Sequence, residues 1–287
     1  MKYVRPDSYE AASALLGEET GIARILSGGT DVLVQMRSEV VEPSLIIDLK
    51  HLDGMREIVT EDGGFRIGAA VSGAQLAEHE ALCAAWPGVV EAAGLIGSSQ
   101  IQSRASLAGN LCNGSPAADS VPAMVAAGAV ARVFGAEGFR DVPVAEIPAG
   151  PGKTNLKKGE FLISIYLPVR PERAGDAYLR FIPRTEMDIA VCSAGINLVT
   201  GEEGTCTEVR VALGAVAPTV ILVEEAASAL IGSKLDDEAL KGLAAAVEAA
   251  CRPIGDKRGT VEFRIKTAGV LARRAAEIAY QRAGAKR

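Results

Sequence analysis

The sequence is short of the side chains that most often bind metals or exchange protons in catalysis. Its 287 residues include only two histidines, His51 and His79, and five widely separated cysteines. The cysteines are odd in number and form no C-x-x-C pair, so neither a disulfide framework nor a zinc or iron–sulfur site made by this chain alone is predicted. We therefore expect reduced thiols, no metal ligands and no catalytic triad built on histidine.

Long apolar runs, aromatic side chains and excess positive charge are also missing. No run approaches the roughly 18 apolar residues of a membrane span. Residues 1–6 lack the apolar core of a signal peptide, which favours a cytoplasmic location. The net charge of −6 disfavours general binding to nucleic acids or anionic membranes. Apolar residues make up 48% of the chain and aromatic residues 4%, so we expect a substantial core with mainly aliphatic packing.

Two common nucleotide-binding motifs are incomplete in this sequence. Gly152-Lys153-Thr154 looks like the end of a P-loop, but Ile147 stands where that motif requires its first glycine. No complete G-x-G-x-x-G fingerprint follows a predicted strand either. A P-loop NTPase and a Rossmann dinucleotide site are therefore disfavoured.

What the sequence does contain is two stretches of small and polar residues. The first is Ser27-Gly28-Gly29-Thr30-Asp31, and the longer second one, 106–119, combines glycine and alanine with Ser106, Asn110 and Asn113. Small residues let a backbone approach a ligand closely, and hydroxyls and amides add polar contacts. Either stretch alone is also compatible with a turn or a structural loop. Together they indicate a clamp around an extended anionic ligand, such as a dinucleotide pyrophosphate.

The apolar pattern of the first part of the chain predicts alternating strands and helices. Residues 1–57 have the order β-α-β-α-β, a hairpin follows within 57–71, and the stretch 106–119 is predicted as a loop. The other predicted elements are helices at 72–80, 88–95 and 121–127 and strands at 129–134, 140–144 and 161–165.

From residue 175 the pattern changes to antiparallel strands followed by helices. The polar segment 170–176 before it predicts a linker. In the final helix, apolar residues recur at spacings of three and four, as on the buried face of an amphipathic helix. The predicted strands are 177–183, 190–199 and 209–214, and the predicted helices are 237–250 and 261–283.

Taken with these elements, the two small-residue stretches resemble those of the FAD-binding medium subunit of molybdenum hydroxylases, the xanthine dehydrogenase and carbon monoxide dehydrogenase family. Residues 27–31 resemble the family's first flavin loop, A-G-G-T-D, and residues 101–110 resemble its I-R-N-x-A-T-I-G-G-N segment. The segments 159–162, 187–191 and 270–275 resemble, in turn, the strand that closes the flavin domain, the opening of the C-terminal domain and its final helix. The likeness covers nearly the whole chain.

The sequence departs from the family pattern in the second segment. Ala108 stands where the family often has the first glycine of a pair, which the loop tolerates if φ at that residue is negative. Gln102-Ser103 replaces the usual Arg-Asn and removes one positive charge, for which Arg104 substitutes in part. We expect Gly109 to hold a positive φ close to the ligand, so that Gly109→Val abolishes flavin binding.

The resemblance implies an α+β fold in two domains. Residues 1–172 would form a two-part FAD-binding domain of the PCMH (vanillyl-alcohol-oxidase-like) type, with subdomains at about 1–57 and 58–172. Residues 173–287 would form a CO dehydrogenase flavoprotein-like C-terminal domain, with a three-stranded antiparallel sheet and a helical bundle.

The resemblance also implies a site for non-covalently bound FAD. Backbone amides of 27–31 and 106–110 would hold the pyrophosphate, and Asp119 would accept a hydrogen bond from a ribose or ribityl hydroxyl. Ile96 and Leu162 would pack on the flavin or adenine, and Arg180 would lie near the isoalloxazine. No residue of this chain is expected to be catalytic. The candidate residues are Ser27, Gly28, Gly29, Thr30, Asp31, Ile96, Ser106, Ala108, Gly109, Asn110, Asn113, Asp119, Leu162 and Arg180.

As a function, the resemblance implies electron transfer within an oxidoreductase complex. A large partner subunit would hydroxylate the substrate at a molybdopterin cofactor, and two [2Fe-2S] clusters on a small subunit would pass electrons to FAD. The acceptor would be NAD, a quinone or another carrier, and the assembly would consist of paired heterotrimers. The absence of a substrate-shaped cluster of titratable groups from this chain agrees with that role, but nothing in the sequence identifies the substrate or the acceptor.

Two other classes of protein stay open at this stage. One is a free-standing FAD-dependent oxidase or dehydrogenase of the same flavin-binding fold, and the other is a scaffold that has lost its flavin. Flavin subunits of the 4-hydroxybenzoyl-CoA reductase type carry an additional cysteine-ligated iron–sulfur cluster. They are disfavoured because the five cysteines of this chain are scattered.

Overall fold

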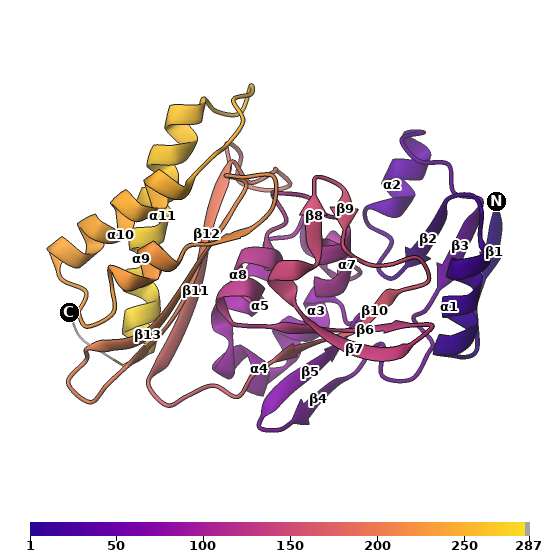
Figure 1. Cartoon of the computed structure of the whole chain (residues 1–287), viewed down its shortest axis with the longest axis horizontal. Helices are drawn as coiled ribbons and strands as arrows, with labels where there is room; N and C mark the ends of the chain where they lie inside the picture. The colour runs from indigo at the N-terminus through magenta and orange to yellow at the C-terminus, as the bar shows by residue number, and fades with distance from the viewer. Residues whose placement is uncertain (285–287) are drawn as a thin grey trace.

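The computed structural model describes residues 1–284, which form three successive parts (Figure 1). The last three residues of the predicted C-terminal domain lie outside the described range. The strands are β1 Lys2–Val4, β2 Ala23–Leu26, β3 Leu45–Asp48, β4 Ile58–Glu61, β5 Gly64–Gly68, β6 Val130–Gly135, β7 Gly138–Pro143, β8 Pro148–Gly150, β9 Lys153–Thr154, β10 Phe161–Leu167, β11 Ala174–Phe181, β12 Cys192–Thr200, β13 Cys206–Gly214 and β14 Ile221–Leu222. The helices are α1 Tyr9–Glu18, α2 Val32–Arg37, α3 Gly73–Glu78, α4 Glu80–Ala85, α5 Pro87–Ala93, α6 Ser99–Gln102, α7 Leu107–Cys112, α8 Ser120–Ala126, α9 Glu224–Ser228, α10 Asp237–Ala250 and α11 Val261–Arg282, with a 3₁₀ turn at Val144–Glu146.

The N-terminal part confirms the predicted β-α-β-α-β order. Its three strands form a parallel sheet in the order β1-β3-β2, and the central strand β3 is buried along its whole length. Ser8 begins α1, because its hydroxyl accepts a hydrogen bond from the amide of Ala11 at 3.1 Å. Helix α2 has no buried residue and projects at the top of this part (Figure 1).

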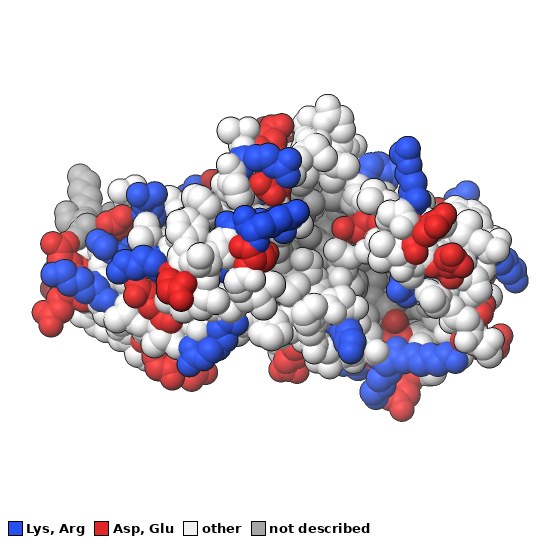
Figure 2. All heavy atoms as spheres, turned by 90° about the horizontal axis from the view of Figure 1, so that it is seen from above, with Lys and Arg blue, Asp and Glu red and all other residues white. Residues whose placement is uncertain are grey.

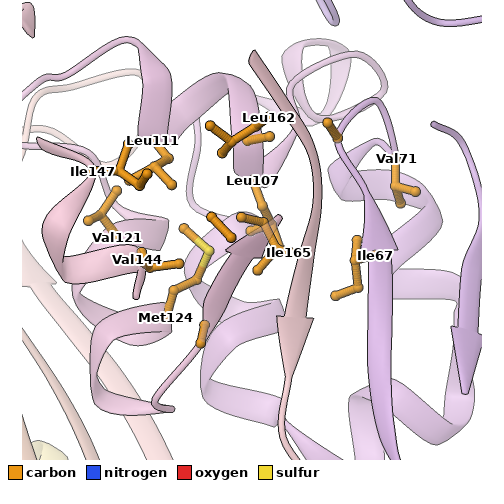
Figure 3. Close-up of a cluster of buried hydrophobic side chains, with 14 of the residues drawn as sticks. Ile67, Val71, Leu107, Leu111, Val121, Met124, Val144, Ile147, Leu162 and Ile165 are labelled. Carbon is orange, nitrogen blue, oxygen red and sulfur yellow. The ribbon is translucent and has the colours of Figure 1, made fainter. Parts of the chain in front are cut away.

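The middle part is built on a five-stranded antiparallel sheet in the order β4-β5-β10-β6-β7, which includes the predicted hairpin β4–β5. Helices cover one face of this sheet. Figure 3 shows Leu107 and Leu111 of α7 pointing into an apolar cluster with Met124 of α8 and Ile165 of β10. One core therefore joins the sheet to both helices.

The stretch 106–119 was predicted as a loop, and this is wrong for its first half, which is helix α7. Ser106 begins the helix, because its hydroxyl accepts a hydrogen bond from the amide of Gly109 at 3.1 Å. Burial of Leu107 and Leu111, four residues apart on one face, offsets the weak helix propensity of glycine and asparagine.

The C-terminal part contains a four-stranded antiparallel sheet in the order β11-β12-β13-β14. Its first three strands are those predicted, and the two-residue β14 adds an edge. Helix α10 has the predicted bounds of 237–250, and α11 packs along β11 and β12. A second apolar core, separate from that of the middle part, lies between the sheet and these helices.

The segment 170–176 is not the linker predicted from its polarity. Strand β11 already begins at Ala174, and Asp176 is only 4% exposed. The Asp176 carboxylate accepts a hydrogen bond from Arg170 at 2.9 Å, and the Arg170 guanidinium lies 4.6 Å from the centre of the Trp86 ring. Polar residues at the boundary thus bond to each other and hold the two domains together. No helix of residues 1–284 is both long and apolar enough to cross a membrane.

Candidate functional site

A cavity of about 720 Å³ lies between the N-terminal part and the middle part, within the roughly 300–1,000 Å³ typical of cofactor sites. Figure 2 shows the surface hollowed between the N-terminal part, at the right, and the centre of the molecule. The cavity brings together most of the predicted site. The candidates that line it are Ser27, Gly28, Gly29, Thr30, Asp31, Ile96, Ser106, Ala108, Gly109, Asn110, Asn113 and Leu162.

The first loop owes its shape to two glycines with different requirements. Strand β2 ends at Leu26, and the chain then turns at Gly29, whose φ is +80°. A Cβ atom at Gly28 would lie 2.0 Å from the carbonyl oxygen of Arg104, so only glycine lets the loop pack against the second segment. Both positions are therefore closed to other residues.

The same loop offers donors for an anion. In the part of the chain that the structure describes, the amides of Gly28, Gly29 and Thr30 donate no hydrogen bond to another protein group. Consecutive free N–H groups in a turn form a concave site for phosphate oxygens. These three residues are partly exposed at the cavity, where a ligand can reach them.

Helix α7 lines the cavity beside this loop. Since Leu107 and Leu111 enter the core, Gly109, Asn110 and Asn113 are on the cavity side. Gly109 does not have the positive φ that we predicted, because it lies inside the helix. A Cβ atom there would meet only the Ser106 hydroxyl, at 3.1 Å, within 4 Å.

The backbone at Ala108 accepts a side chain, as the sequence analysis required. It lies in α7 and has no positive φ, so its methyl group is accommodated. The side-chain amide of Gln102, which replaces the usual arginine, donates to the backbone carbonyl of Gly94 at 2.6 Å. Arg104 contributes its backbone carbonyl, close to Gly28.

Hydrogen bonds join the first loop and α2 to the segment 106–113. The hydroxyls of Ser27 and Ser106 lie 3.1 Å apart, and the Asn113 amide donates to the Asp31 carboxylate at 3.1 Å. Gln35 of α2 donates to the Asn113 carbonyl oxygen, also at 3.1 Å. Partial burial raises the pKa of Asp31. The two stretches are therefore parts of one wall.

Two candidates, Asp119 and Arg180, do not line this cavity. Arg180 donates to one Asp119 carboxylate oxygen at 2.6 Å, and the Tyr178 hydroxyl donates to the other at 2.8 Å. Burial raises the pKa of Asp119 to about 6, against the opposing effect of the Arg180 charge and the two hydrogen bonds. The pair links the middle part to strand β11 of the C-terminal sheet.

Several residues that the sequence reasoning missed also line the cavity. Leu16, Ile25 and Leu156 give it apolar walls suited to a planar ring, and Lys157 and Lys158 give it positive charge suited to phosphate. The adjacent lysines just before Gly159 were a visible signal in the sequence. The apolar residues carried no such signal, because they resemble any other buried side chain.

Residues that could attach a flavin covalently are poorly placed. Among the described residues, neither His51 nor His79 lines the cavity. Cys112 does line it, but burial raises the pKa of its thiol to about 12, so the reactive thiolate is suppressed. No group of three or more potential metal ligands occurs in residues 1–284.

Comparison with known proteins gives matches over the whole chain. A family model for the FAD-binding domain in molybdopterin dehydrogenase matches residues 1–170, and one for the CO dehydrogenase flavoprotein C-terminal domain matches residues 177–279. The chain is 35% identical to the carbon monoxide dehydrogenase medium chain of Afipia carboxidovorans, over 98% of this chain and 97% of that one.

Two further relatives agree with this match. The xanthine dehydrogenase FAD-binding subunit of Escherichia coli O157:H7 is 32% identical, over 92% of this chain and 91% of that one. The structure of reconstituted CO dehydrogenase from Oligotropha carboxidovorans superposes with a TM-score of 0.93 at 34% identity, over 98% of both chains. This chain therefore belongs to the FAD-binding medium subunits of the molybdenum hydroxylase family, whose members are oxidoreductase subunits of the CO and xanthine dehydrogenase type.

Proposed function

We propose that this chain binds one FAD per subunit, without a covalent link, in the cavity that residues 27–31 and α7 line together. The observation that carries the proposal is the row of free amides at Gly28, Gly29 and Thr30, which lines the cavity beside the small residues of α7. The tight packing of Gly28 on Arg104 keeps this row in place. The site fits a cofactor with an anionic centre and planar ends.

Each part of the wall has a distinct task in this proposal. The free amides and the side chains of Lys157 and Lys158 bind the pyrophosphate. Ile96 and Leu162 flank a ring system and keep water from it. When bound, FAD supplies the redox chemistry, and the protein supplies binding and orientation. The remaining candidates that line the cavity are assigned to the site as the family resemblance implies, whereas Asp119 and Arg180 bond to each other outside the cavity lining.

We further propose that the chain passes electrons from [2Fe-2S] clusters of a small partner subunit to an external acceptor, in paired heterotrimers with a large molybdopterin subunit. The names of the relatives as medium chain and FAD-binding subunit support this assembly. All five cysteines are free thiols, which supports a reducing compartment such as the cytoplasm.

The flavin itself gives a direct test. The purified chain, incubated with FAD and desalted, is expected to be yellow with about one FAD per subunit. Precipitation with trichloroacetic acid should then release the colour into the supernatant. Colour retained in the pellet would contradict non-covalent binding, and a colourless protein would favour the scaffold alternative.

The electron-transfer role is tested by comparing the isolated chain with the complex. Alone, the chain should bind FAD but oxidise none of the substrates of the complex. Co-expressed with neighbouring small and large subunits, it should form a stable assembly whose flavin is reduced when substrate is added. Substrate turnover by the isolated chain at typical enzyme rates of about 1–1,000 per second would instead indicate a free-standing oxidase.

A further inference from the structure

Helix α8 lies at the boundary between the two domains and is seated directly on the C-terminal sheet. All of its residues are buried. A Cβ atom at Gly195 of β12 would lie 2.6 Å from the carbonyl oxygen of Pro122, so only glycine permits this approach. Arg210 of β13 donates to the carbonyl of Val125 at 3.1 Å. The sheet therefore determines where α8 lies.

The residues just before α8 are held by the same sheet. The amide of Ala215, which follows β13, donates to the carbonyl of Pro116 at 2.7 Å. Tyr178 and Arg180 of β11 hold the two carboxylate oxygens of Asp119, the residue that precedes the helix. Both charged side chains are about nine-tenths buried, so these bonds are shielded from water.

Helix α8 in turn holds α7. The backbone amide and the hydroxyl of Ser120 both donate to the side-chain carbonyl oxygen of Asn110, at 3.1 and 2.7 Å. Ser120 is fully buried. Because Leu107 and Leu111 anchor the opposite side of α7 in the core, the bond at Asn110 fixes the rotation of the helix (Figure 3). That rotation decides how Gly109 and Asn113 face the cavity.

We propose that the C-terminal domain sets the affinity of the site for FAD through a buried relay from Tyr178 to Asp119, Ser120 and Asn110, which orients α7. Tyr178 and Ser120 are positioning residues in this relay, since neither lines the cavity. The inference deepens the proposed FAD-binding function and rests on it. It gives the C-terminal domain, which contributes none of the cavity lining, a role in cofactor binding.

A pair of matched tyrosine variants tests the relay. Tyr178 is 3% exposed and donates one hydrogen bond of 2.8 Å to Asp119, while Tyr280 is 1% exposed and donates one of 2.7 Å to the Gly204 carbonyl inside the C-terminal domain. Tyr178→Phe and Tyr280→Phe should lower the melting temperature by similar amounts. Only Tyr178→Phe should raise the Kd for FAD, by at least about fivefold, and change the visible circular dichroism of the bound flavin.

Ser120→Ala provides a second route if Tyr178→Phe does not fold. It removes the 2.7 Å bond to Asn110 without touching the cavity wall, and it should also weaken FAD binding at least about fivefold. Kd values for FAD within twofold of the wild type in both variants would overturn the relay alone. A wild-type chain with no affinity for FAD would overturn the proposed function, and the relay with it.

Discussion

The cavity wall and the domain boundary use polar groups in opposite ways. At the wall, the amides of Gly28, Gly29 and Thr30 are partly exposed and make no hydrogen bond within the described protein. At the boundary, the carboxylates of Asp119 and Asp176 are buried, and each is held by an arginine. At the wall the free amides remain available to a ligand, as the proposed function requires. At the boundary the polar groups bond to each other and join the two domains.

This difference shows that a buried charge is not by itself a sign of a binding site. Desolvation raises the pKa of both Asp119 and Asp176, as in many catalytic carboxylates. Their partners nevertheless come from the protein. The proposed FAD site instead combines free backbone donors with a glycine that has no room for a side chain.

The largest effect is expected from removing one half of a boundary pair. Asp176→Ala leaves the Arg170 guanidinium buried without its partner, which should lower the free energy of unfolding by about 3–5 kcal/mol. Urea denaturation measures this loss, and FAD affinity of the folded fraction should stay unchanged. A double variant, Arg170→Met with Asp176→Leu, should recover part of the stability. A loss below about 1 kcal/mol would mean that this buried ion pair contributes no more to stability than an exposed one.

At the cavity wall, Gly28→Val should abolish specific FAD binding with a smaller loss of stability. The added Cβ atom must push the loop away from the Arg104 carbonyl, only 2.0 Å away, and this displaces the free amides. We expect at least about a hundredfold rise in Kd, or about 2.7 kcal/mol, by fluorescence titration with FAD. Gly17→Ala in α1 is the control, because a Cβ there meets no atom within 4 Å. Normal FAD stoichiometry in Gly28→Val would remove this loop from the site.

Gly109→Val should act more weakly than the sequence indicated. The helical backbone of α7 accepts a side chain, and the Cβ atom has only the Ser106 hydroxyl at 3.1 Å to displace. Its methyl groups narrow the cavity, so we expect a rise in Kd for FAD of about tenfold, with Gly109→Ala closer to wild type. Complete loss of binding in Gly109→Ala would show that the ligand contacts this backbone directly.

The smallest effect belongs to an exposed ion pair on the five-stranded sheet. Arg132 and Asp141 are bonded at 2.8 Å, but their side chains are 32% and 46% exposed. Arg132→Met should change the free energy of unfolding by at most about 1 kcal/mol, and less at high salt. A larger loss would mean that burial does not decide the difference between the boundary pairs and surface pairs.

Much of the fold was predictable because its signals are local. Ser8 and Ser72 begin helices by accepting hydrogen bonds from amides three residues on, and that spacing can be read directly from a sequence. The bounds of α10 follow from its apolar spacing and from Asp236 before it. The small residues of 27–31, taken together with those of 106–119, predicted a clamp around an anionic ligand, since small residues let the backbone approach a ligand closely.

Local sequence was enough to predict the order of the main elements and the chemical nature of the two small-residue stretches, because both depend on neighbours along the chain. The tertiary structure was needed to show that Gly28 has no room for a side chain, that α7 is helical, and that the residues around Asp176 join the two domains. Each of these depends on partners far away in the sequence: Arg104 for Gly28, the apolar core for α7, and Trp86 and Val89 for the Arg170–Asp176 pair. Such partners are set by how buried surfaces fit together, which local spacing does not encode.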